Sequence, residues 1–421
     1  RTVHTGLLEY KNVYRPARVI SYNKESGELV LHNYMDFDDL KDYVKISYEL
    51  TQDGLVISKG ILPEFSVAPH GEGKTNLKIN VPENGKCYLK LIYHLKKELP
   101  LLDEDHILGF DEIEVSKEDT KCKLAEKWIP KTVVDSELQV NENDTQIHIK
   151  GREFAYTIDK RTALFTEMKF AGREYLNHPM ELNIWRAPTD NDMYIKSEWK
   201  KAHYDKAYTR AYTTEVVQGK HGVKITSHAS VVAETVQKIL DVTITWKIEA
   251  AGKIDADIAV TKDDEFPDLP RFGVRMFLDK KLSAVRYFGM GPQESYCDKH
   301  QAASHGLYRA DVGDLHEDYI RPQENGSHYD CEYVELNNSR YGIVVSAENA
   351  FSFNASYYTQ EELEEKTHNY ELTESDSVVF CVDYALNGIG SNSCGPVVLE
   401  QYRFDDVLFR FQFTLIPYVK G

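Results

Sequence analysis

Residues 240–248 read Leu-Asp-Val-Thr-Ile-Thr-Trp-Lys-Ile, with apolar and polar residues alternating strictly. A period of two places one set of side chains on a core and the other in water, which is typical of a β-strand in a sandwich. The alternation recurs in four further segments: residues 254–258, 407–416, 154–158 and 29–32. Only residues 360–366 look helical, with Thr359 as N-cap. The sequence therefore predicts an all-β fold.

The length of 421 residues predicts two or three domains. A charged, non-periodic stretch at 117–121 and the Ile129-Pro130-Lys131 break mark a boundary. We expect an immunoglobulin-like β-sandwich over residues 1–117, a linker over 118–137, and a larger antiparallel sandwich over 138–421.

Composition excludes several classes of function. A net charge of −18 argues against nucleic-acid binding, which needs clustered Lys and Arg. No apolar run reaches the ~18 residues of a membrane span, and no signal peptide is visible. The six cysteines include no Cys-x-x-Cys pair, which favours free thiols in a reducing cytoplasm. The chain begins at Arg1 and not at Met, so we expect it to be processed or to belong to something longer.

Four polar segments rich in Gly, Pro or Asx interrupt the strands of the larger part: residues 185–192, 287–296, 321–327 and 388–396. In the first, Asp190, Asn191 and Asp192 could bind sugar hydroxyls or a hard cation, although a tight Asx turn is the better interpretation. The second is not a dinucleotide fingerprint, because its third glycine is missing. The fourth is a loop of small residues whose backbone could approach a ligand.

Glu294 and Glu324 could be the paired carboxylates of a glycosidase, which lie ~5–5.5 Å apart in retaining enzymes. Structural carboxylates are commoner, and the sequence gives no separation. A second interpretation is a stand-alone carbohydrate-binding sandwich or a mutarotase-like sugar epimerase, which needs a general acid and a base. Its candidate residues are His300, His305, His328 and Glu324.

Taken in order, the four segments resemble the C-terminal region of glycoside hydrolase family 2 β-galactosidases of the long, five-domain kind. The stretches that carry the resemblance are Arg186-Ala-Pro-Thr-Asp-Asn-Asp192, Gly289-Met-Gly-Pro-Gln-Glu-Ser-Tyr296, Pro322-Gln-Glu-Asn-Gly326 and Gly388-Ile-Gly-Ser-Asn-Ser393. The resemblance is strong over residues 138–421 and weaker over the first 117.

This resemblance implies a galactose mutarotase-like supersandwich and, in the whole enzyme, retaining hydrolysis of terminal β-D-galactosides. The family's acid/base and nucleophile glutamates lie in a (β/α)₈ barrel, which needs about 250 residues of alternating strands and helices. We therefore expect no catalytic residue, metal or cofactor in this chain, whereas Mg and Na are implied for the full enzyme.

The resemblance also implies a mobile lid near residues 199–204 and an aromatic platform in the final loop. Cys394 occupies the platform position, where many relatives carry Trp, and a thiol cannot stack on a sugar as an indole can. A glycine of the lid is absent between Ala202 and His203. The residues expected to contact substrate are Asp190, Asn191, Asp192, His203, Tyr204, Glu324, Asn325, Ser393 and Cys394.

We thus expect the C-terminal, non-catalytic part of a cytoplasmic β-galactosidase that helps to complete the sugar site and the assembly. The expected partners are a β-galactoside such as lactose and the N-terminal catalytic barrel of the same enzyme, with homo-oligomerisation of the whole enzyme and no nucleic acid or membrane. A third possibility is the small subunit of a two-chain β-galactosidase.

Overall fold

The computed structural model describes residues 3–117 and 138–420. Within them the chain divides into two compact units. The first holds the described residues up to 117 together with 288–292 and 300–307, and the second holds the remainder. The predicted linker, residues 118–137, lies outside the described residues, so the position of the domain boundary stays a prediction.

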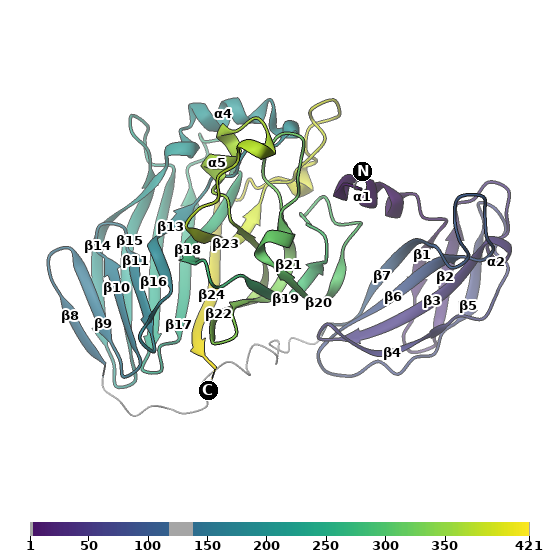
Figure 1. Ribbon diagram of the computed structural model, residues 1–421, viewed down its shortest axis with the longest axis horizontal. Helices are drawn as coiled ribbons and strands as arrows, with labels where there is room; N and C mark the ends of the chain where they lie inside the picture. Colours follow the sequence, from purple (N-terminus) through teal and green to yellow (C-terminus); the bar gives the residue numbers. More distant parts are fainter. Residues whose placement is uncertain (1–2, 118–137, 421) are drawn as a thin grey trace. The chain divides into compact units, whose positions relative to one another are not determined.

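The first unit is a β-sandwich of seven strands, visible in Figure 1. A three-stranded sheet of order β1-β2-β5 and a four-stranded sheet of order β4-β3-β6-β7 share one apolar core, which includes Leu31 from β2 and Leu89 from β6. The elements are α1 Thr5–Val13, β1 Ala17–Tyr22, β2 Glu28–Asn33, α2 Leu40–Tyr43, β3 Val44–Gln52, β4 Leu55–Ile61, β5 Glu72–Asn76, β6 Lys86–Leu95 and β7 Ile107–Lys117.

The second unit is a larger antiparallel sandwich. Its elements are β8 Gln139–Glu142, β9 Gln146–Lys150, β10 Phe154–Asp159, β11 Leu164–Phe170, β12 Arg173–Glu174, β13 Leu176–Asn183, α4 Ile195–Lys201, β14 Tyr208–Gln218, β15 Gly222–Val232, β16 Leu240–Glu249, β17 Ile254–Lys262, β18 Arg271–Asp279, β21 Ser327–Asn337, β22 Tyr341–Ser356, α5 Gln360–Glu365, β23 Ser377–Leu386 and β24 Leu408–Val419. Two further strands, β19 Ala284–Gly291 and β20 Ser304–Asp311, contribute residues to both units.

The alternating segments form the centre of this unit. In β16 the apolar residues from Leu240 to Ile248 are all at most 1% exposed, while Asp241 and Lys247 point to solvent. Trp246 packs edge-on against Phe165 of β11, with ring centroids 4.9 Å apart, so the five-stranded sheet β12-β11-β10-β9-β8 lies on the long sheet. The indole nitrogen donates to the Ala163 carbonyl at 2.8 Å, which satisfies its only polar group.

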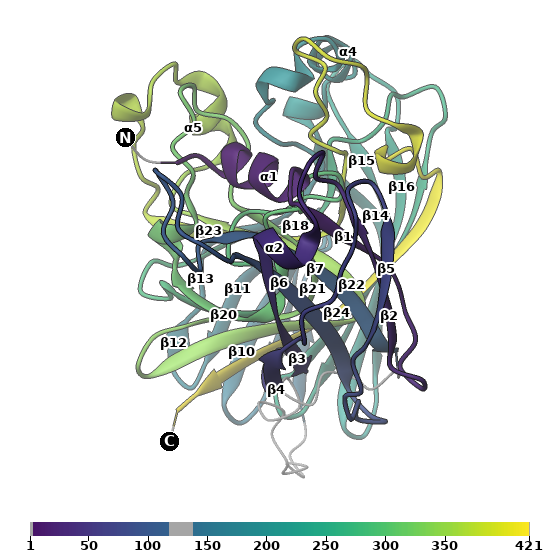
Figure 2. The ribbon, with the colours of Figure 1, turned by 90° about the vertical axis from the view of Figure 1, so that its right-hand side faces the viewer.

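These observations confirm the predicted all-β architecture of two consecutive sandwiches. The predicted helix is also confirmed, since α5 begins after Thr359 and the Thr359 hydroxyl accepts a hydrogen bond from the Glu362 amide at 3.1 Å. The expectation of a single helix is wrong, because α1, α2 and α4 are helical as well. Both α4 and α5 lie at one end of the second unit (Figures 1 and 2).

Candidate functional site

Hydrogen bonds within the second unit join residues from all four polar segments. The Gly326 amide of the third segment donates to the Glu294 carboxylate of the second at 2.8 Å. The Gln323 side chain accepts a hydrogen bond from the Asp190 amide at 2.9 Å, which joins the third segment to the first. The Asn191 amide donates to the Gly390 carbonyl at 2.7 Å, and its oxygen accepts from the Ser393 hydroxyl at 2.8 Å, which joins the fourth. Segments far apart in the sequence thus form one polar loop cluster.

Hydrogen bonds to the buried Asp192 carboxylate stabilise the Asx turn of this cluster. Residues 190–192 form a 3₁₀ turn in which the Asp192 carboxylate accepts from the Thr189 amide at 2.9 Å and its hydroxyl at 3.1 Å. Arg186 donates to both oxygens of the same carboxylate, at 3.2 and 2.7 Å, and both side chains are almost fully buried. The predicted turn is therefore confirmed. Asp192 is occupied by these structural bonds, whereas Asp190 is exposed and Asn191 half-buried.

The loop that follows β23 has no regular secondary structure over residues 387–390. Hydrogen bonds from three side chains to its backbone stabilise it. Arg186 donates to the carbonyls of Asn387 at 2.5 Å and Gly388 at 3.1 Å. Asp298 accepts from the amides of Ile389 at 2.9 Å and Gly390 at 2.7 Å. With the Asn191 contacts above, backbone groups on both edges of the loop are satisfied, and its tip at Ser393 and Cys394 is exposed.

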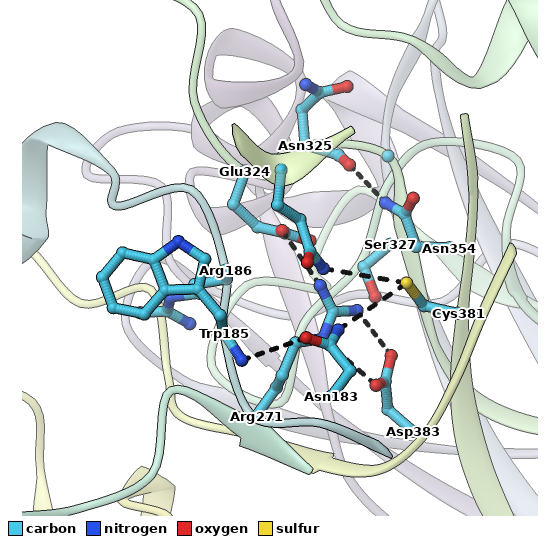
Figure 3. Close-up of polar contacts among 12 residues, drawn as sticks. Asn183, Trp185, Arg186, Arg271, Glu324, Asn325, Ser327, Asn354, Cys381 and Asp383 are labelled. Atoms are coloured by element: carbon cyan, nitrogen blue, oxygen red, sulfur yellow. Dashed lines mark hydrogen bonds and ion pairs between the residues drawn. The ribbon is translucent and has the colours of Figure 1, made fainter. Parts of the chain in front are cut away.

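A buried charge centre lies beside the loop cluster (Figure 3). The guanidinium of Arg271, at the start of β18, donates two hydrogen bonds, of 3.1 and 2.5 Å, to the Asp383 carboxylate of β23. It also donates to the Glu324 carboxylate at 3.2 Å. One guanidinium therefore serves two carboxylates. Within the described residues, the second oxygen of Glu324 has no hydrogen-bond partner.

Burial raises the pKa of Glu324 above its usual value, against the pull of the neighbouring Arg271 and Arg186 guanidinium groups. Desolvation disfavours a charged carboxylate, and here it outweighs the two cations because Arg271 is already paired with Asp383. The carboxyl of Glu324 is therefore the least satisfied ionisable group of the centre.

Glu294 has the opposite environment. Burial raises its pKa, but the Lys299 ammonium at 2.5 Å and hydrogen bonds from Lys299, Tyr319 and the Gly326 amide bring the pKa below its usual value. Glu294 and Glu324 are 7% and 4% exposed. Both are engaged in structural contacts away from solvent, so the geometry gives no support to their use as paired carboxylates for glycoside cleavage.

Residues 199–204, the segment expected to form a lid, pack against residues 267–268 within the second unit. Trp199 of α4 is fully buried and donates from its indole nitrogen to the Asp268 carbonyl at 2.9 Å, and the Tyr204 hydroxyl donates to the Pro267 carbonyl at 2.7 Å. His203 adopts a left-handed backbone with φ of 58°, a conformation that favours glycine. The side chain of His203 is half-buried.

The remaining candidates, Asn325 and three histidines, are buried or half-buried. Asn325 is 5% exposed, and its amide donates to the Gln323 carbonyl at 2.9 Å, so it shapes the loop. His328 is 1% exposed and packs with its ring 5.0 Å from that of Phe353. His300 and His305 belong to the first unit, whereas His328 and Glu324 belong to the second.

Sequence reasoning missed three residues that build the site: Arg271, Asp383 and Asp298. A signal existed for the first two, because each is a charged residue in a largely apolar strand, and charged residues are buried only with a partner. Asp298 gave no signal, since its role is to bind backbone amides.

No group of three or more His, Cys, Asp or Glu side chains that could hold a metal ion occurs in the part of the chain that is described. The cysteines at 87, 297, 331, 381 and 394 are free thiols. Across residues 3–117 and 138–420, no helix has the length and apolar character to cross a bilayer.

The fold and the loop cluster define a two-unit, all-β protein whose larger sandwich carries an exposed, rigidly held polar loop. The sequence of residues 150–415 matches the protein-family model of the β-galactosidase small chain, and residues 29–116 match the family model of β-galactosidase domain 4. The chain therefore belongs to the β-galactosidase small-chain family.

Similar proteins include a β-galactosidase from Actinobacillus pleuropneumoniae, 43% identical over 99% of this chain and 40% of that protein. Another from Staphylococcus xylosus is 31% identical over 99% of this chain and 41% of that protein. The chain thus spans about 40% of the length of these relatives. A solved galactose 1-epimerase from Lactobacillus acidophilus aligns with 68% of this chain and 99% of its own, at 8% identity and a TM-score of 0.37.

Proposed function

We propose that this chain is the C-terminal, non-catalytic part of a cytoplasmic β-galactosidase that hydrolyses terminal β-D-galactosides with retention (EC 3.2.1.23). Its relatives are β-galactosidases, and the stretch they share with it is about 40% of their length. The catalytic carboxylates, and the Mg and Na of the whole enzyme, would then be supplied by the part that the chain does not span.

The observation that carries the proposal is the fixed loop at residues 387–393. Arg186, Asp298 and Asn191 hold this backbone in one conformation and leave Ser393 and Cys394 at an exposed tip. Preorganised loops are what a binding site needs, because little conformational freedom is lost when a ligand or partner docks. In our proposal the tip, with Asp190 beside it, completes the sugar site of the assembled enzyme.

The chain alone should have no glycosidase activity, because Glu294 and Glu324 are buried and engaged. The test is an assay of the purified chain with a chromogenic β-galactoside, in parallel with polarimetry on α-galactose. Hydrolysis at an enzyme-like rate would overturn the proposal, and acceleration of mutarotation would favour the epimerase interpretation.

The loop is tested in the assembled enzyme. Asn191→Ala removes the tether between the Asx turn and the loop tip, and we expect kcat/KM to fall by about 10–100-fold, as for a small misplacement of a positioning group. Asn177→Ala is the matched control, since that amide lies elsewhere and bonds to Ser377 at 3.1 Å. Equal activity of the two variants would contradict a role for the loop in the site.

A further inference from the structure

The second unit contains a cavity of about 330 Å³ beside the C-terminal end of β23. Its walls come from residues 296–297, from β21, β22 and β23, and from residues 401–406. Four tyrosines line it, at 296, 329, 384 and 402, together with Asp330, Arg403 and Asp406. The loop-tip residues Ser393 and Cys394 are not part of its lining.

The walls of the cavity are fixed by contacts behind them. The Tyr384 ring stacks on Phe409 with centroids 4.9 Å apart and an interplanar angle of 16°. The Phe404 amide donates to the Asn387 side chain at 2.9 Å, and the Tyr402 carbonyl accepts from the Gly388 amide at 2.8 Å. A cavity with walls held this way is formed before any ligand arrives, which is the usual state of a binding pocket.

The chemistry of the lining selects among ligand classes. Two carboxylates and one guanidinium give a net charge near −1, which disfavours phosphates and other anions. The mixture of polar and aromatic groups disfavours a purely apolar ligand. Tyrosine rings can pack against the C–H face of a sugar, while carboxylates accept hydrogen bonds from neighbouring hydroxyls.

We propose that this cavity binds a neutral monosaccharide, with the Tyr402 ring against the sugar face and Asp406 accepting from its hydroxyls. The inference does not depend on the proposed activity. The affinity should be weak, on the order of 1 mM, because roughly a dozen heavy atoms make few contacts.

The experiment is calorimetric titration of the 421-residue chain with D-galactose and D-glucose to about 50 mM, with inorganic phosphate as the anionic probe. Saturable binding of a hexose is expected, with no binding of phosphate. Tyr402→Ala should weaken it ~10-fold and Asp406→Asn several-fold. Tyr370→Ala is the control, because Tyr370 is 83% exposed and lies outside the lining.

Asn191→Ala distinguishes this cavity from the loop cluster, and circular dichroism verifies that each variant folds. Binding that survives Asn191→Ala and fails in Tyr402→Ala supports the cavity whatever the activity of the assembled enzyme. Three results would overturn the inference: no hexose binding, binding unchanged in both cavity variants, or binding of phosphate in preference to sugar.

Discussion

The fork between Arg271 and Asp383 provides the most quantitative test of how the site is held. Arg271→Met keeps a side chain of similar length and removes the guanidinium. Asp383 would lose two hydrogen bonds, of 3.1 and 2.5 Å, and Glu324 its bond of 3.2 Å. Breaking a buried pair by removing one partner costs about 3–5 kcal/mol. We expect the upper half of that range, because two buried carboxylates lose one shared cation.

The assay is urea unfolding at pH 7 followed by tryptophan fluorescence. Three of the four tryptophans, at 185, 199 and 246, are buried in the second unit, and residues 3–117 contain none. The fourth, Trp128, lies outside the described residues, so the assay uses a Trp128→Phe background, in which the fluorescence reports the unit that contains Arg271. With a slope of about 3 kcal/mol per molar urea, a loss of about 4–5 kcal/mol lowers the midpoint by ~1.5 M.

Arg410→Met is the matched control. Arg410 forks onto Asp257 in the same way, but its side chain is 61% exposed, against 1% for Arg271. Water screens an exposed pair, so the midpoint of this variant should stay close to that of the unmodified chain. Equal midpoints for the two variants would refute the reasoning that burial makes the Arg271 centre essential.

Three further predictions concern single residues around the same centre. Because burial raises the pKa of Glu324, the folded state binds the proton of this carboxyl more tightly than the unfolded state does, and this group makes stability fall as the pH rises above about 4.3. Glu324→Gln should therefore flatten the pH dependence of the urea midpoint measured upward from about pH 4, and an unchanged dependence would count against this reasoning. A Cβ at Gly273 would lie 2.2 Å from the Val382 carbonyl oxygen, so Gly273→Ala should destabilise the second unit by about 1–3 kcal/mol, whereas Gly219→Ala, which meets only an ordinary 3.6 Å contact, should not. Asp298→Ala should speed deuterium uptake at the amides of Ile389 and Gly390, and an unchanged rate would show that Asp298 does not fix the loop.

The sandwich architecture could be predicted from the sequence because its signal is local. In β16 and β17, and in β24 as far as Phe413, the alternation alone separates the buried side chains from the more exposed ones, whereas residues 415–418 of β24 are all buried. The helix α1 could not be predicted in the same way, since no side chain caps its first turn and its N-cap position is His4.

The sequence predicted the polar loop residues of the site but not the buried charge centre beside them. Asp190, Asn191 and Ser393 stand out as polar loop residues, and the structure places them in one cluster. The charge centre depends on the register between β18 and β23, which brings together residues 112 positions apart. That pairing is set by the whole sheet, so neither strand reveals it alone.

Glu324 shows most clearly what could not be predicted from the sequence. As an isolated carboxylate in a loop segment it was a candidate for substrate binding, and the structure places it beneath the surface at 4% exposure, beside Arg271.

The central claim is that this chain completes a sugar site whose catalytic groups lie in the part it does not span. Complementation measures this directly: the chain is mixed with the separately purified remainder of the enzyme, and hydrolysis of a chromogenic β-galactoside is followed as the chain is titrated. We predict that neither component is active alone and that activity rises to saturation near one equivalent. Full activity of the remainder without the chain would contradict the claim.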